Sequence, residues 1–126
     1  MKLNNNLYSI ISRDLSDSPI SYVIQLDAKH FIYKAHFPGE PITPGVCVLQ
    51  IAKELLEDYL GKELNIQSVK NVKFLGVISP VEISHVKYVF EKVINDTNKN
   101  VINVQSLVLS DNNVLTKLSF TCIEKR

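Results

Sequence analysis

The sequence has no excess of charge of either sign and no apolar run long enough to cross a membrane. Its 14 basic and 13 acidic side chains give a formal net charge of +1. This balance gives no electrostatic reason to expect nucleic acid or an anionic membrane surface as a partner. No apolar run approaches the roughly 20 residues of a membrane-spanning helix. The first residues also lack the long apolar core of a signal peptide.

Cysteine is scarce, and the common metal and nucleotide motifs are absent. The two cysteines, Cys47 and Cys122, lie far apart in the chain. We expect two free thiols in a reducing compartment, and therefore a cytoplasmic protein. No group of His, Cys, Asp or Glu has a ligand spacing such as HxxxH or CxxC, so we expect no metal site. Because there is no glycine-rich phosphate loop or dinucleotide fingerprint, we expect no nucleotide cofactor.

The chain has the size and composition of one globular domain. Its 126 residues are 45% hydrophobic and 21% charged, which are ordinary values for a soluble fold. A chain of this length can bury a core without disulfides or metals. We therefore expect a single domain spanning residues 1–126.

The strongest local signal is a helix between Thr43 and Gly61. Thr43 is a good N-cap residue, Pro44 suits the first helical position, and Gly61 is a natural stop. An apolar face and a polar face follow at helical spacing. The expected apolar face is Val48, Leu49, Ala52, Leu55, Leu56 and Tyr59, and the polar face is Gln50, Lys53, Glu54 and Glu57. Such a helix buries one side and leaves N–H groups at its start.

Most of the remaining chain is predicted to be β-strand. Alternation from Ile20 to about Asp27 places Tyr22, Ile24 and Leu26 on one face. Residues 7–11 fit either a brief strand or a first helical turn, and residues 30–35 are expected to be extended. Further strands are expected at 66–75, 81–94, 101–109 and 114–123, with Val86, Tyr88 and Phe90 on one face. Long antiparallel strands with one helix indicate an α+β domain.

The residues from His36 to Glu54, HFPGEPITPGVCVLQIAKE, carry a resemblance to a known family. They resemble the 3-hydroxyacyl-acyl-carrier-protein dehydratases of fatty acid synthesis, and the match is specific from His36 to Val46. Lys73 to Leu75, followed by Pro80, is loosely similar to a second family motif. The resemblance implies a hot-dog fold, in which an antiparallel sheet wraps one central helix. It also implies a homodimer, or a higher oligomer of dimers.

The resemblance assigns roles to His36, which precedes the helix, and to Gly45 and Val46, which lie in its first turn. His36 lies nine residues before Gly45, the family spacing for the catalytic histidine, and a neutral-pH imidazole can act as base and then acid. A lone histidine can instead simply pack at a strand end. The N–H groups of Gly45 and Val46 are expected to hold a thioester carbonyl. Gly45 could alternatively serve only close packing, and both roles are compatible.

Gln50 departs from the family pattern. Catalytic dehydratases place Glu or Asp at this position to handle the leaving hydroxyl, whereas a carboxamide can hydrogen-bond the hydroxyl but cannot donate and recover a proton. Glu54 lies where many relatives have Gln, so the acid and amide look exchanged, and Glu54 is a possible alternative acid. The opposing interpretation groups Glu54 with Lys53 and Glu57 on a solvated helix face.

The implied activity is that of a hydro-lyase, with His36 and Gln50 as catalytic residues. It would remove water from a 3-hydroxyacyl thioester to give the trans-2-enoyl thioester. The substrate would be carried on the phosphopantetheine of acyl carrier protein or of CoA, with no metal or redox cofactor. One alternative is a hot-dog acyl thioesterase using Glu54 or a bound water. Another is a non-catalytic subunit that binds acyl thioesters or the carrier protein, which Gln50 favours.

Overall fold

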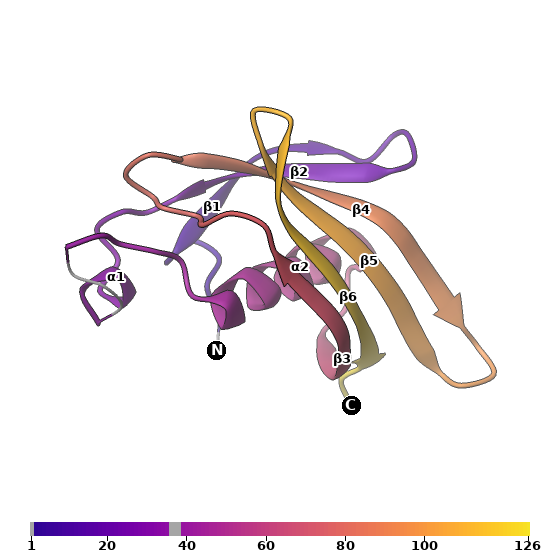
Figure 1. The fold of residues 1–126 in the computed structure, drawn as a ribbon. Coiled ribbons are helices and arrows are strands. Elements are labelled where there is room, and N and C mark those ends of the chain that lie inside the picture. Colours follow the sequence, from indigo (N-terminus) through magenta and orange to yellow (C-terminus); the bar gives the residue numbers. More distant parts are fainter. Residues whose placement is uncertain (1, 36–38) are drawn as a thin grey trace.

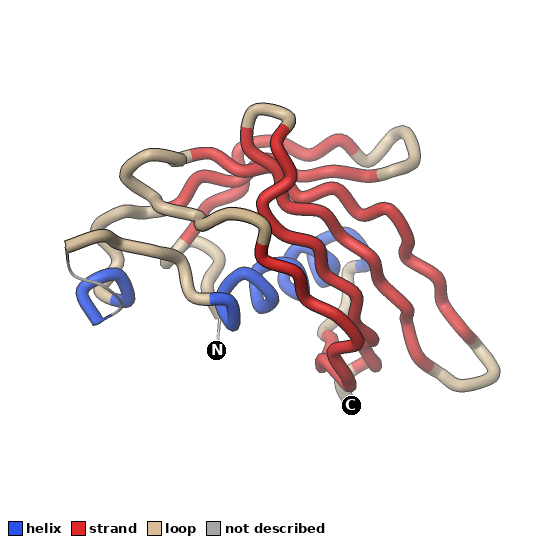
Figure 2. The backbone as a smooth tube through the Cα atoms, viewed as in Figure 1, coloured by secondary structure: helices blue, strands red, loops and turns tan. Residues whose placement is uncertain are grey.

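The computed structural model describes residues 2–35 and 39–126, and a six-stranded antiparallel sheet curves around one long helix (Figure 1). The sheet order is β1-β2-β4-β5-β6-β3, so β1 and β3 form its two edges. The smooth tube of Figure 2 shows the long helix lying in the concave side of this sheet. The strands are β1 Tyr8–Asp14, β2 Ile20–Leu26, β3 Leu64–Phe74, β4 His85–Asp96, β5 Val101–Ser110 and β6 Asn113–Glu124.

The central helix α2 (Gly45–Leu60) confirms the strongest sequence prediction, with its start displaced by one residue. The N-cap is Pro44, in an extended conformation, and not Thr43. The Thr43 hydroxyl instead shares a 2.9 Å hydrogen bond with the Tyr33 hydroxyl in the core, so it does not cap the helix. Gly61 ends the helix as expected, in the left-handed conformation at φ 69°, with its N–H donating to the Glu57 carbonyl.

One face of α2 packs against the concave side of the sheet. Its buried apolar residues are Cys47, Val48, Ile51, Ala52, Leu55 and Leu56. They meet alternating residues from neighbouring strands, which are among the most buried side chains in the protein. The buried face of α2 is rotated slightly from the predicted apolar face, since Tyr59 is 40% exposed and Leu49 is only partly buried. Because each Å² of apolar area removed from water stabilises a fold by about 25 cal/mol, this contact contributes to the stability of the domain.

The strand predictions are confirmed in the middle of the chain and are less accurate at its start. Tyr22 and Ile24 of β2 are fully buried, and so is the β4 row of Val86, Tyr88 and Phe90. Residues 7–11, for which two structures were possible, belong largely to β1. The predicted strand at 81–94 begins only at His85, because residues 79–84 form a turn closed by the Ile83 N–H on the Ser79 carbonyl.

The prediction of an extended segment at residues 30–35 is wrong. The structure contains a short helix, α1 (Ile32–Ala35), in its place. Nδ1 of His30 accepts the Ile32 N–H at 3.1 Å, and the His30 ring stacks on Phe31 with centroids 4.5 Å apart. A side chain that bonds the backbone two residues ahead competes with an extended conformation and favours a turn. His30 is therefore a buried turn residue and not a strand end.

No helix within residues 2–35 and 39–126 is long and apolar enough to span a membrane. Cys47 and Cys122 are both buried free thiols. Burial raises the pKa of both, to about 12 for Cys122, so neither thiol is ionised at neutral pH.

Candidate active site at the start of the central helix

Among the described residues, no side-chain hydrogen bond caps the first turn of α2. Pro44 precedes the helix and makes no capping hydrogen bond. The first N–H groups of any helix lack partners within it, and the helix dipole adds positive potential there. Gly45 and Val46 occupy this turn, and Val46 is 69% exposed. A helix start of this kind can hold an anion or a polarised carbonyl oxygen, and the role of Gly45 and Val46 in binding a thioester stays a prediction.

A cavity of about 230 Å³ opens at this helix start. Its walls come from the segment before α2, the first turns of the helix, the end of β3 with the loop after it, and Thr116 of β6. The β3 side contributes Phe74 and Val77, and the helix side contributes Gly45 and Val48. The site thus joins a polar helix terminus to a largely apolar hollow, a combination typical of small-molecule sites.

Gly45 is required here by close packing. A Cβ built on Gly45 would lie 2.6 Å from Cζ of Phe74, closer than real Cβ atoms approach other heavy atoms. The missing side chain therefore lets the Phe74 ring lie over the first turn of the helix. The packing role of Gly45 is thus observed directly.

Gln50 forms a defined hydrogen bond with Glu54 one turn further along α2. Nε2 of Gln50 donates to Oε2 of Glu54 at 2.8 Å. Because an ionised carboxylate can only accept, the amide must turn its NH₂ group toward Glu54. The pair lies on one side of the helix at the (i, i+4) spacing that brings side chains together.

Glu54 is buried, so the prediction that it belongs to a solvated helix face is wrong. Only 6% of the residue is exposed. Its carboxylate accepts the Leu3 N–H at 3.0 and 2.8 Å, the Asn4 N–H at 2.8 Å and the Tyr8 hydroxyl at 3.1 Å, in addition to Gln50. These donors compensate the cost of burying a charge. Glu54 therefore anchors the start of the chain to α2.

The Tyr8 hydroxyl is held in its protonated form beside this carboxylate. Burial is the main cause that raises the pKa of Tyr8, and the nearby Glu54 charge raises it further. Tyr8 therefore donates its proton in the hydrogen bond to Glu54. The sequence pointed to this group of residues only through Gln50 and Glu54, whose positions look exchanged relative to the family pattern. It gave no indication that the backbone of Leu3 and Asn4 would bond Glu54.

A second carboxylate on α2, Asp58, ties the helix to the β1–β2 edge. Arg13 donates to both of its oxygens, at 2.8 and 3.0 Å, and the Tyr22 hydroxyl donates at 2.6 Å. The hydrogen bond from Arg13 is the main reason that the pKa of Asp58 is lowered. Asp58 lies roughly three and a half turns beyond Gly45 and Val46. The cluster therefore packs the sheet edge on the helix at a distance from the helix start.

The remaining predicted residues are placed as follows. His36, with Phe37 and Pro38, lies outside the described residues, so its predicted role as base stays a prediction. Gly45, Val46 and Gln50 lie on the first turns of one helix. His85 starts β4 at the surface, with Nδ1 2.9 Å from the Ser84 hydroxyl. Within the described part of the chain, no three His, Cys, Asp or Glu side chains cluster closely enough to hold a metal ion.

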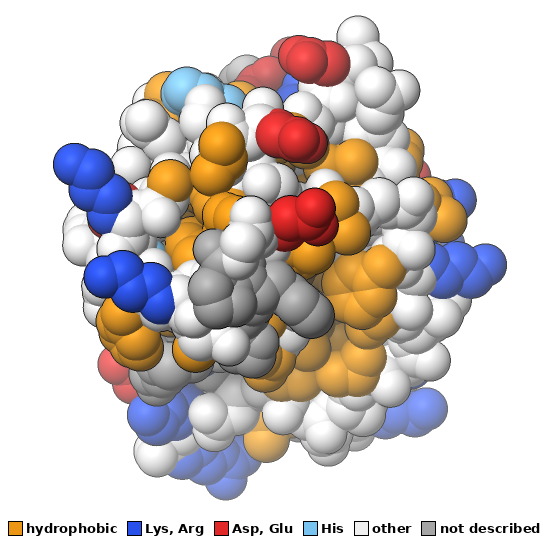
Figure 3. Space-filling model, turned by 60° about the vertical axis from the view of Figure 1, so that its left-hand side comes forward, with side chains coloured by type: hydrophobic (Ala, Val, Ile, Leu, Met, Phe, Trp, Pro, Cys, Tyr) orange, Lys and Arg blue, Asp and Glu red, His pale blue; other side chains and the backbone are white. Residues whose placement is uncertain are grey.

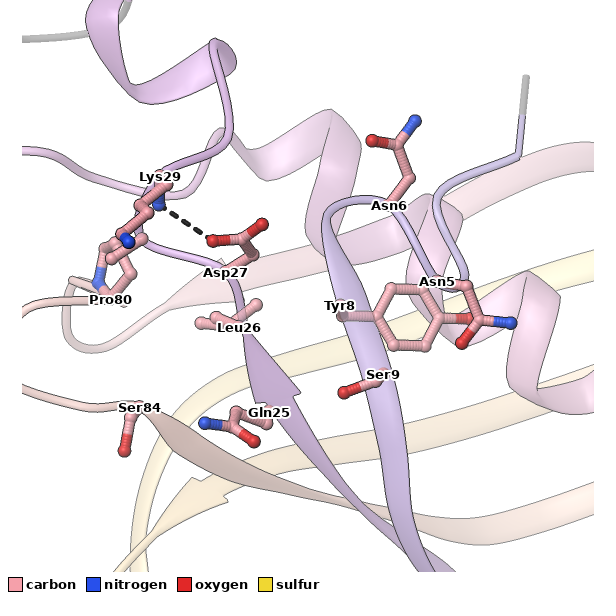
Figure 4. A pocket seen from close by; sticks show the side chains of 11 residues that line it. Asn5, Asn6, Tyr8, Ser9, Gln25, Leu26, Asp27, Lys29, Pro80 and Ser84 are labelled. Carbon is pink, nitrogen blue, oxygen red and sulfur yellow. Dashed lines mark hydrogen bonds between the residues drawn. The ribbon is translucent and has the colours of Figure 1, made fainter.

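A larger cavity, about 550 Å³, lies elsewhere, along the β1–β2 edge (Figure 4). Polar side chains such as Asn5, Gln25 and Ser84 line it, and the Asp27 carboxylate accepts the Lys29 N–H at 2.9 Å. Its lining includes none of the predicted site residues that the structure describes. We therefore place the candidate site in the smaller hollow at the start of α2.

The surface beside this hollow is apolar. Figure 3 shows the side of the molecule on which α1 lies, with hydrophobic side chains gathered in a patch. Among the exposed large hydrophobic residues, Phe74, Leu75 and Val77 follow one another at the end of β3 and beyond it, at 57%, 60% and 58% exposure. Apolar surface of this kind marks contact with a ligand or another protein.

Comparison with solved structures identifies the fold. An uncharacterised protein from Erwinia carotovora subsp. atroseptica is similar with a TM-score of 0.69 and 19% identity, covering 94% of this chain and 97% of that one. The dehydratase heterocomplex ApeI:P from Xenorhabdus doucetiae is similar with a TM-score of 0.65 and 18% identity, covering 90% and 96%. The predicted α+β hot-dog fold is confirmed.

Comparison with protein sequences identifies the family. The 3-hydroxyacyl-[acyl-carrier-protein] dehydratase FabZ of Latilactobacillus sakei is 29% identical over 94 residues, which cover 67% of each chain. FabZ of Rickettsia conorii is 29% identical over 101 residues, covering 74% of this chain and 67% of the relative. A family model described as ApeI-like, ApeI dehydratase, matches residues 12–113. Since this match spans most of the chain, the protein belongs to the ApeI-like family of hot-dog dehydratases.

Proposed function

We propose that this protein removes water from a 3-hydroxyacyl thioester to give the trans-2-enoyl thioester, or catalyses the reverse addition. The observation that carries the proposal is the uncapped start of α2 opening on an apolar hollow. A thioester carbonyl placed there gains hydrogen bonds from the N–H groups of Gly45 and Val46 as negative charge develops on its oxygen. One such donor is typically worth about 2.7–4 kcal/mol in the transition state.

The proposed reaction balances without a metal or a redox cofactor. His36 takes the proton from C2, and the charge that remains is delocalised onto the thioester oxygen held by Gly45 and Val46. The C2–C3 double bond then forms as the C3–O bond breaks. His36 returns its proton to the departing hydroxyl, which leaves as water. Gln50 binds the 3-hydroxyl by hydrogen bonding and positions it, since a carboxamide cannot supply the proton itself.

We further propose that the working unit is a homodimer, or an oligomer of such dimers, in which His36 and Gln50 of one site come from different subunits. Strand β3 is an edge of the sheet within the described residues, and most of its side chains are exposed. An exposed strand edge is a template for pairing with a second copy. The apolar residues Phe74, Leu75 and Val77 continue that edge beside the candidate site. Light scattering should therefore report a mass of twice 14.3 kDa.

The acyl group would arrive on the phosphopantetheine of acyl carrier protein or of CoA. This proposal is supported by the named activity of the FabZ relatives, which are acyl-carrier-protein dehydratases. The cytoplasm is the proposed compartment, because Cys47 and Cys122 are both unpaired.

A non-catalytic role in binding acyl thioesters is the second candidate. It is favoured by the Gln50–Glu54 pair, because Gln50 carries no acidic proton and Glu54 already accepts hydrogen bonds from four donor groups, those of Leu3, Asn4, Tyr8 and Gln50. Incubation with 3-hydroxybutyryl and crotonyl thioesters, followed by mass spectrometry, separates the candidates. Gain or loss of one water supports the dehydratase, whereas release of the free acid would indicate a thioesterase. Binding without conversion would indicate the non-catalytic role. The variant His36→Ala is the control for the enzymatic reaction.

A further inference from the structure

Thr116 is a polar residue in a row of core residues. Alternate residues of β6 face α2, and Thr116, Leu118, Phe120 and Cys122 are 0%, 3%, 1% and 0% exposed. Thr116 is the first residue of this row. It pairs with Phe74 of β3, and the Phe74 ring lies over Gly45. The one hydroxyl of the row is therefore located at the start of α2, beneath the candidate site.

The Thr116 hydroxyl is buried and has no hydrogen-bond partner among the described residues. Several other buried hydroxyls among the described residues are paired. Thr43 bonds Tyr33, Thr121 bonds Ser68, and the Tyr88 hydroxyl donates to the Val48 carbonyl at 2.9 Å. Because an unpaired buried hydroxyl costs free energy, its presence calls for an explanation beyond packing.

The cavity at the start of α2 supplies that explanation. Thr116 lines it together with apolar side chains, including Val48, Phe74 and Val77. The other hydroxyl in its lining, that of Thr43, is already bonded to Tyr33. At about 230 Å³ the cavity is smaller than the roughly 300–1,000 Å³ of a complete ligand site, so it has room for only part of a ligand.

We propose that this cavity binds a short acyl chain that carries an oxygen atom, and that Thr116 recognises that oxygen. A threonine hydroxyl both donates and accepts, so it can pair with a hydroxyl or a keto oxygen on the chain. A plain hydrocarbon chain of the same length leaves the hydroxyl unpaired and binds less tightly. The proposal rests on the proposed function, because the thioester group held by Gly45 and Val46 brings the chain to the cavity.

The test measures binding and needs no turnover. Titration calorimetry with the full chain would compare hexanoyl-pantetheine with its 4-, 5- and 6-hydroxy derivatives, which differ only in one oxygen. The wild-type protein should bind one of the hydroxylated chains about tenfold more tightly than hexanoyl, a difference of about 1.4 kcal/mol. Thr116→Val, which has the same shape without the hydroxyl, should bind both kinds of chain alike. Thr116→Ser should retain the preference.

The other outcomes overturn the proposal. If the wild-type protein shows no preference for any hydroxylated chain, Thr116 does not recognise chain oxygen, whether or not the Thr116→Val variant folds. If Thr116→Val weakens binding of all thioesters equally, its hydroxyl contacts the common thioester group instead. A preference without any dehydration of 3-hydroxybutyryl-pantetheine would support Thr116 and count against the proposed function. The two failures are thus distinguishable.

Discussion

Replacing Gln50 by glutamate tests both the geometry of the helix pair and the proposed chemistry. In the wild-type chain, Nε2 of Gln50 lies 2.8 Å from Oε2 of Glu54. Gln50→Glu puts a carboxyl oxygen in place of that nitrogen, directly beside a carboxylate that is only 6% exposed. Two ionised carboxylates cannot occupy this position, because like charges at such a distance repel strongly. One proton should therefore remain on the pair at neutral pH.

The size of this effect follows from Coulomb's law. At an effective dielectric constant of 20 and about 4 Å separation, two unit charges repel by about 4 kcal/mol. One pKa unit corresponds to 1.36 kcal/mol, so the introduced carboxyl group should have its pKa raised by about 3 units, from about 4.3 to about 7. The oxygens of Glu54 already accept hydrogen bonds from Leu3, Asn4 and Tyr8, whereas the new carboxyl group at position 50 has no such donors from the start of the chain. The proton should therefore reside at position 50, where it can act as a general acid.

Two measurements check this reasoning. Dehydration should be faster in Gln50→Glu by about a hundredfold, the typical gain from a positioned general acid, and the gain should be lost as pH rises above about 7. The melting temperature should also depend on pH. Because the folded-state pKa is raised, the variant should lose stability relative to wild type as pH rises from about 4 to about 7. Gln50→Met, which removes the hydrogen bond without adding charge, is the control.

The double variant Gln50→Glu/Glu54→Gln separates the charge effect from the catalytic one. With the second charge removed, the pKa at position 50 should fall, and the pH above which the rate declines should fall with it. A melting-temperature difference between Gln50→Glu and wild type that is constant from pH 4 to 8 would refute the reasoning. Such a result would mean that the two side chains separate in solution and that the 2.8 Å contact is not maintained.

Three further predictions concern other parts of the site and its support. His36→Ala should abolish dehydration while leaving the circular dichroism spectrum unchanged, and retained activity would remove His36 from the mechanism. Gly45→Ala should lower the free energy of unfolding by about 1 kcal/mol, measured in urea, because its Cβ would displace the Phe74 ring, and Phe74→Leu should restore much of the loss. Asp58→Asn should cost about 1 kcal/mol at pH 7, since Arg13 loses its partner at a partly exposed site. Because the folded-state pKa of Asp58 is lowered, this difference should shrink as pH falls below about 4 and vanish once pH has passed through the lowered pKa, and a difference that does not shrink in acid would contradict the assignment.

The elements with strong local signals could be predicted from the sequence. The limits of α2 followed from Pro44 and Gly61, and the buried faces of β2 and β4 followed from strict alternation. Strand order was not available from these patterns and came from the resemblance. The segment at 30–35 was mispredicted, because its short helix depends on the His30 ring bonding the Ile32 N–H, a contact that periodicity does not reveal.

The site was predictable only where its residues are adjacent in the chain. Gly45, Val46 and Gln50 share one helix, so a short motif could identify them together. Thr116 and Phe74 reach the same cavity from strands that pair only in the folded sheet. Thr116 stands in an alternating row of β6 as an ordinary strand residue. Its significance depends on the absence of a hydrogen-bond partner among the described residues, which only the three-dimensional structure shows.

Glu54 explains why position 50 carries an amide in this chain. Two backbone N–H groups and a phenol converge on residue 54 from the start of the chain, and only a carboxylate can accept from all of them. An amide at position 54 would point its NH₂ group at the N–H groups of Leu3 and Asn4 or at the Tyr8 hydroxyl, so donors would face donors. Once that carboxylate is fixed and buried, an ionised acid at position 50 would face it at hydrogen-bond distance, whereas an amide satisfies it. Anchoring Leu3 and Asn4 to the helix therefore calls for a carboxylate at position 54 and favours an uncharged hydrogen-bond donor at position 50.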